Sequence, residues 1–139
     1  MLGLVLAGCG GRSQPVPYVD MTRQAGQLEF THITVKLFDN RHDLVEVLER
    51  NNPGRRLELP RVDFRRQQVY LVAAGPRSST GYDLRIVRVR DQGGRVLVVV
   101  REQTPSLGDP VEARVTYPFR LIALPRSDEP VKLKWLERP

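Results

Sequence analysis

The chain has 139 residues, of which 40% are hydrophobic and 27% are charged, as in a typical globular domain. This size and composition exclude a multidomain machine, a collagen-like chain and a wholly disordered chain. The single cysteine excludes an intramolecular disulfide, and 11 glycines with 11 prolines favour a domain of several short strands joined by turns.

The chain is basic, with 22 Lys and Arg against 16 Asp and Glu, and its only lysines are Lys36, Lys132 and Lys134. One interpretation is an anionic partner, such as nucleic acid, phospholipid headgroups or an acidic polymer. The alternative is a high-GC or thermophilic genome that favours arginine. Because aromatic residues are only 6% and do not alternate with the basic ones, we expect no nucleic-acid partner.

The N-terminus predicts a lipid anchor. Residues 1–8 carry no charge and are too few to span a bilayer. They end in Leu6-Ala7-Gly8 before the only cysteine, Cys9, and this order resembles the lipobox of bacterial lipoproteins. The resemblance implies a signal remnant over 1–8, lipidation at Cys9 and an extracytoplasmic place on the cell membrane or outer membrane. A basic signal region is missing, so we expect either an upstream start or a truncated chain; the alternative is an apolar strand with a buried cysteine.

The next segments are a tether, a strand and a helix. Residues 9–27 are polar and contain two prolines, which is typical of a tether. The range Leu28–Phe38 alternates loosely and predicts a first strand with a bulge near His32. Asn40 is a good N-cap for a helix over residues 41–50, which Asn51-Asn52-Pro53-Gly54 ends.

The rest of the chain predicts further strands. Val69–Ala74 is an unbroken apolar run, which predicts a central strand buried on both faces. Tyr82–Arg90 and Val96–Glu102 form a hairpin about the turn Asp91-Gln92-Gly93-Gly94. Arg85, Arg88 and Arg90 are expected on the solvent face of that hairpin.

Two last strands complete the domain. The range Ala113–Leu124 contains Pro118, so we expect it at a sheet margin or a bend. Val131–Leu136 predicts a short strand whose Trp135 covers the core. The predicted fold of residues 28–139 is therefore a mainly β domain: an antiparallel β-sandwich or half-open barrel of about six to seven strands with one short helix.

No residue set predicts catalysis, a metal or a cofactor. A zinc site needs three or four clustered ligands, but the only histidines, His32 and His42, are not near other good ligands in the sequence. The hydroxyls of Ser78, Ser79 and Thr80 have no sequence-local base to activate them. We therefore expect a protein that is not an enzyme.

Four motifs in order resemble the C-terminal domain of the protease-complex subunit PrcB. They are Asp63-Phe64 before the apolar strand, the turn Ser79-Thr80-Gly81-Tyr82, the strand end with Glu102, Pro105 and Gly108, and Tyr117-Pro118. The resemblance covers roughly residues 30–126. It implies a β-rich, non-enzymatic envelope domain that binds another envelope protein and helps to assemble or stabilise a surface protease.

The loop after the apolar strand is the candidate partner-binding site. Its residues are Gly75, Pro76, Arg77, Ser78, Ser79, Thr80, Gly81 and Tyr82. It also resembles, with two extra residues, the loop that chagasin-type cysteine-protease inhibitors insert into a protease cleft, so inhibition by Pro76–Tyr82 is the alternative function. The structural alternative is an ordinary turn in which the glycines supply backbone freedom.

Overall fold

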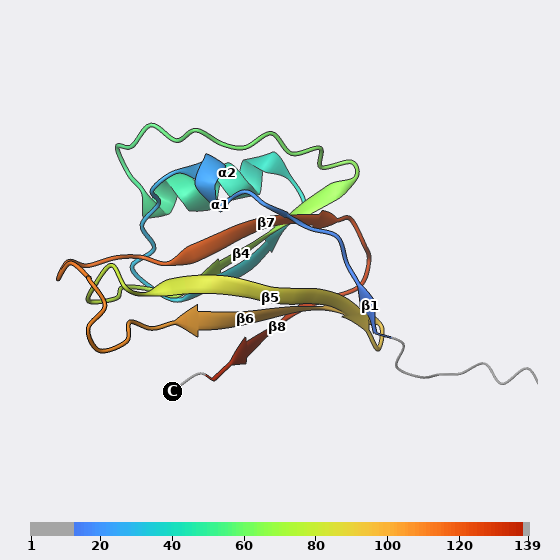
Figure 1. The fold of residues 1–139 in the computed structure, drawn as a ribbon. Coiled ribbons are helices and arrows are strands. Elements are labelled where there is room, and N and C mark those ends of the chain that lie inside the picture. The colour runs from blue at the N-terminus through green and yellow to red at the C-terminus, as the bar shows by residue number, and fades with distance from the viewer. Residues whose placement is uncertain (1–12, 138–139) are drawn as a thin grey trace, which may run out of the picture.

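The computed structural model describes residues 13–137, which form two four-stranded sheets packed face to face (Figure 1). The sheet orders are β1-β5-β6-β8 and β2-β7-β4-β3, and both helices lie on the outer side of the second sheet (Figure 1). The strands are β1 Gln14–Pro15, β2 Val19–Asp20, β3 Thr34–Phe38, β4 Gln67–Ala73, β5 Asp83–Gln92, β6 Arg95–Gln103, β7 Phe119–Pro125 and β8 Val131–Leu136; the helices are α1 Thr22–Ala25 and α2 Arg41–Asn51. The predicted mainly β sandwich is confirmed, and the sheets do not close into a barrel.

The molecule has two apolar layers that share β4. Leu71 faces the helices and packs in one cluster with Leu44 and Leu48 of α2 and with Phe30. Tyr70 and Val72 on the opposite face of β4 pack against the β5–β6 sheet. Successive side chains of a strand point to opposite faces, so a strand between two apolar layers must be apolar throughout. The predicted burial of Val69–Ala74 on both faces is confirmed.

Helix α2 begins and packs as predicted. The Asn40 side chain accepts a hydrogen bond from the Asp43 amide at 2.9 Å, which caps the first turn. The side chains of Leu44, Val47 and Leu48 are buried against the sheet. Among the described residues, no helix is long and apolar enough to span a membrane.

The hairpin and the last strand are also found, with one difference in direction. β5 and β6 pair antiparallel, with a register shift between Ile86 and Arg88 that leaves Val87 exposed. β8 has the predicted bounds, and Trp135 packs against the core between the sheets. However, β8 runs parallel to β6, because the chain crosses from β7 in one sheet to β8 in the other.

The predicted tether over residues 9–27 is wrong from Gln14 onward. β1 pairs with β5 and β2 pairs with β7, so this segment contributes a strand to each sheet. Met21, which precedes α1, and Ala25, the last residue of α1, have buried side chains, and this second helix was not predicted. Apolar residues spaced along a polar segment were sufficient to fix it to the domain. Residues 9–12 lie outside the described part of the chain.

Two strand predictions are wrong in their bounds. The strand predicted over Leu28–Phe38 is β3, which starts only at Thr34. Leu28 and Phe30 are buried outside any strand, and β3 pairs with β4 without a bulge near His32. β7 starts only at Phe119, directly after Pro118, and lies between β2 and β4 instead of at a margin. Pro118 precedes the strand, so its missing N–H removes no bond from the ladder.

Candidate functional site

Two loops meet at one end of the sandwich. Residues 75–82 connect β4 to β5, and residues 104–118 connect β6 to β7. We call these two segments the loop platform. Figure 1 shows them together at the end of the strands opposite to β1. The first segment is the predicted site, and the second includes residues that the sequence assigned to a strand.

Backbone hydrogen bonds join the two segments. The Arg77 and Thr116 amides each donate to the other residue's carbonyl, at 2.8 and 2.9 Å. Farther along, the Thr80 amide donates to the Glu112 carbonyl at 3.1 Å, and the Glu112 amide donates to Thr80 Oγ1 at 2.9 Å. The Thr116 hydroxyl donates to the Ser79 carbonyl at 2.8 Å. The platform is therefore a small paired structure and not two independent loops.

An ion pair fixes the platform to the sheet. The Arg77 guanidinium donates from Nε and Nη2 to the two carboxylate oxygens of Glu102 near the end of β6. Its Nη1 also donates to the Ala74 and Pro76 carbonyls, each at 3.0 Å. The side chains are 25% and 11% exposed, and the bond to Glu102 raises the pKa of Arg77. This planar two-point contact holds the loop in one orientation.

Two glycines of the first segment lie close to other parts of the chain, Gly75 to Ile33 and Gly81 to the second segment. Gly75 has φ +80°, and a Cβ there would lie 3.4 Å from the backbone nitrogen of Ile33. At Gly81 a Cβ would lie 2.5 Å from Pro105 Cβ and 2.7 Å from a Val111 methyl group. Gly81 is therefore required by contact with the second loop.

We expect Gly81→Ala to lower the free energy of unfolding by about 2 kcal/mol, as an added methyl group does in a tightly packed site. The methyl would push Pro105 and Val111 away and open the platform. Urea unfolding of this variant measures the change. Ser78→Ala, at an exposed position of the same loop, is the control and should have little effect. Equal stabilities of the two variants would show that the loops are not in contact.

The structure divides the predicted site into supporting and exposed residues. Gly75 and Ser79 are buried, and four others are half-buried. Only Pro76 and Ser78 are exposed. The half-buried residues are Arg77, Thr80, Gly81 and Tyr82. Most of the predicted loop thus supports the platform, and little of it is free to contact a partner.

The exposed apolar surface of the platform lies on the second loop, whose apolar residues were not among the predicted site residues. Leu107 is fully exposed, and Val111 and Val115 are 42% and 59% exposed. Long loops without regular structure are uncommon in compact domains and are often functional. The sequence does contain a sign of this loop. It has the turn-favouring residues Pro105, Gly108, Pro110 and Pro118, which argue against a strand beginning at Ala113.

In the described part of the chain, neither histidine contacts the hydroxyl groups of the predicted loop as a base would. Within the described residues, no hydrogen bond joins either histidine to Ser78, Ser79 or Thr80, and the His32 ring contacts Thr31 Oγ1 at 3.0 Å. His42, Asp43 and Glu46 gather at the start of α2, but all three are exposed and Glu46 binds Arg50 at 2.8 Å. Cys9 lies outside the described residues, so its lipidation stays a prediction.

The fold and the platform define a two-sheet β domain with paired loops at one end. Residues 69–125 match the family model described as PrcB C-terminal, which confirms the resemblance found in the sequence over that range. No curated protein and no solved structure gives a significant match. The matched range runs from β4 to the end of β7 and includes the whole platform.

The motif residues of the resemblance have structural roles in the platform. Glu102 binds Arg77, and Pro105 packs against Gly81. The Pro118 carbonyl accepts a hydrogen bond from the Ala74 amide at 2.9 Å, which closes the base of the platform. Three of the four motifs therefore meet at this end of the fold, while Phe64 packs against the core beneath the helices.

Proposed function

We propose that the protein is a non-enzymatic cell-envelope lipoprotein that binds another envelope protein through its loop platform and assembles or stabilises a surface protease. The observation that carries this proposal is the set of apolar side chains at Leu107, Val111 and Val115, exposed on the loop platform that the Arg77–Glu102 pair fixes to the sheet. The family name supports a protease complex as the setting, since the matched family is one of accessory, non-catalytic domains.

Physical reasons favour protein binding at the platform. Apolar groups that are exposed together on a rigid support gain free energy when a partner covers them. The bonds between Thr80 and Glu112 and between Arg77 and Thr116 already order the loops, so little conformational entropy is lost on binding. Charged residues between the apolar ones, such as Glu112 and Arg114, supply a polar rim.

The inhibitor alternative has less structural support. A loop that enters a protease cleft must project its side chains, but Thr80 and Tyr82 are half-buried and Ser79 is buried. Thr80 Oγ1 is also occupied by the Glu112 amide. Pro76 and Ser78 remain available, so the alternative is decided by the activity of the captured protease.

The proposed anchor is tested by feeding cells radiolabelled palmitate. The natural chain should incorporate label and sediment with membranes, because a thiol accepts the lipid and Cys9 is the only cysteine. Cys9→Ser should lose the label, since a serine hydroxyl cannot form the thioether. Equal labelling of the two proteins would refute the anchor.

The proposed partner is tested by capture from envelope membranes followed by a protease assay. Leu107→Ser with Val115→Ser should reduce capture of a protease at least tenfold, because two exposed apolar contacts are lost. The control Val19→Ser with Val87→Ser changes two exposed valines far from the platform and should retain capture. Captured protease that remains active supports assembly, and blocked protease supports the inhibitor. Undiminished capture by the platform variant refutes this binding site.

A further inference from the structure

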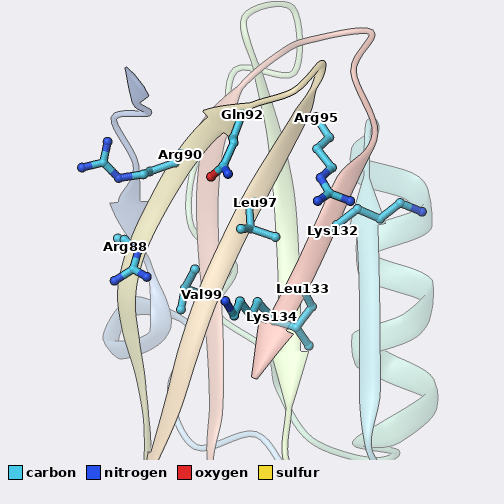
Figure 2. A pocket seen from close by; sticks show the side chains of 9 residues that line it. All are labelled: Arg88, Arg90, Gln92, Arg95, Leu97, Val99, Lys132, Leu133 and Lys134. Carbon is cyan, nitrogen blue, oxygen red and sulfur yellow. The ribbon is translucent and has the colours of Figure 1, made fainter. Parts of the chain in front are cut away.

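The outer face of the β5–β6–β8 sheet carries a cluster of cations. Its residues are Arg88, Arg90, Arg95, Lys132 and Lys134, which with Gln92, Leu97, Val99 and Leu133 line a groove of about 620 Å³ (Figure 2). We call these five cations and the two central apolar residues, Leu97 and Val99, the basic face. Figure 2 shows that the side chains come from three neighbouring strands.

The strand register arranges the basic face in rows. Arg90 pairs with Leu97, which pairs with Lys132 on the other side. Arg88, Val99 and Lys134 form the next row in the same way. Each apolar residue of β6 is thus flanked by two cations, and Val99 is only 1% exposed. The result is a groove with an apolar floor and charged margins.

These cations have no anionic partners in the described part of the chain, where no carboxylate oxygen lies within 4.0 Å of their nitrogen atoms. Arg90 donates to the Ser13 carbonyl and hydroxyl, at 3.3 and 3.2 Å. The nearby Asp91 alternates with Arg90 along β5 and therefore points to the opposite side of the sheet. Strands β5 and β8 are about 10 Å apart, so the unneutralised charges repel each other, and an external anion would relieve this repulsion.

The position of β1 places this face beside the proposed lipid anchor. Gln14 pairs with Asp91 at the sheet edge, next to Arg90. Cys9 is five residues earlier, and five extended residues span at most about 18 Å. A lipid on Cys9 would therefore hold the corner of the sheet that carries Arg90, Gln92 and Arg95 close to the bilayer surface. This step rests on the proposed function.

We propose that the basic face lies on the membrane and binds anionic phospholipid headgroups. Its cationic surface complements a negatively charged bilayer, and each Lys or Arg near such a surface contributes to binding. It contains no aromatic side chain on which a nucleic-acid base could stack. Stable membrane attachment takes two signals, and the basic face would be the second beside the lipid.

The test uses the full chain with Cys9→Ser, so that only the protein surface binds. This protein should sediment with vesicles of phosphatidylcholine and phosphatidylglycerol in equal amounts, and not with phosphatidylcholine alone. Binding should weaken as salt is added. Arg95→Gln with Lys132→Gln and Lys134→Gln should reduce binding on the order of 100-fold, since each exposed cation contributes roughly fivefold.

The matched control removes three exposed cations elsewhere: Arg23→Gln, Arg56→Gln and Arg61→Gln. It has the same net charge as the test variant and should bind nearly as well as the parent protein. Thermal unfolding of both variants confirms that each is folded.

Several results would overturn the inference. They are equal losses in the two variants, equal binding to neutral vesicles, no binding to anionic vesicles, and binding to duplex DNA or heparin without binding to vesicles. Palmitate labelling at Cys9 can succeed in each of these cases, so failure of the inference is distinguishable from failure of the proposed anchor.

Discussion

Arg77→Ala is expected to lower the free energy of unfolding by about 3 kcal/mol, near the lower end of what is lost when one partner of a buried ion pair is removed. Glu102 is only 11% exposed, so without Arg77 its carboxylate would remain largely out of water with no cation beside it. Arg77 also binds the Ala74 and Pro76 carbonyls, and these would lose a donor.

Urea unfolding measures this loss, and two further variants identify its cause. Glu102→Ala should lower the free energy of unfolding by less than Arg77→Ala does, because Arg77 is 25% exposed and keeps its bonds to backbone carbonyls. Arg101→Ala, which removes an exposed pair with Glu137, should have little effect. The double variant Arg77→Ala with Glu102→Ala should lose less stability than the sum of the losses in the two single variants. An Arg77 variant as stable as the Arg101 variant would contradict the structural role of the pair.

Alkaline pH should destabilise the protein through Tyr70. Burial between the sheets raises the pKa of Tyr70 to about 12, from 10.0 in the unfolded chain. The folded state therefore retains a proton that the unfolded state has lost between these values, and stability falls as pH rises through this window. A difference of two pKa units corresponds to about 2.7 kcal/mol, which is present below pH 10 and lost by about pH 12.

The measurement compares the natural chain with Tyr70→Phe in urea on both sides of this window. The phenylalanine variant should lose less stability on going to high pH, because it has no phenol to ionise in the core. Tyr18→Phe, which changes a 38% exposed tyrosine, is the control and should keep the natural difference. If the stability of Tyr70→Phe falls with pH as steeply as that of the natural chain, the loss of stability at alkaline pH comes from other groups.

The sequence predicted the elements whose signals are local. The apolar run at β4, the Asn40 cap of α2 and the turn between β5 and β6 each come from short-range steric or hydrogen-bonding rules. The positions of β1, β2 and β7 depend on partners far along the chain. A two-residue strand such as Val19–Asp20 has no periodicity of its own, and only its pairing with Ala123 and Ile122 defines it.

The loop over residues 75–82 was predicted from the sequence but its contacts were not, and its role in partner binding stays a prediction. The loop 75–82 does join β4 to β5, and Gly75 has the backbone freedom that was expected, whereas Gly81 is required by its contact with Pro105 and Val111. Its bonds to Thr116, Glu112 and Glu102 could not be predicted, because they depend on how two distant loops meet. The exposure of Leu107 and Val115 was not predicted, because apolar residues in a sequence are first assigned to the core.

The connections of the sheets have a consequence for the order of folding. β1 and β2, near the N-terminus, pair with strands from the middle and late parts of the chain, and β8, ending at Leu136, completes the first sheet. The β5–β6 hairpin is closed by a short turn and can form locally, but its neighbour β8 is synthesised only after β7, which belongs to the other sheet. The first sheet is therefore complete only after β7, the last strand of the second sheet, and then β8 have been synthesised.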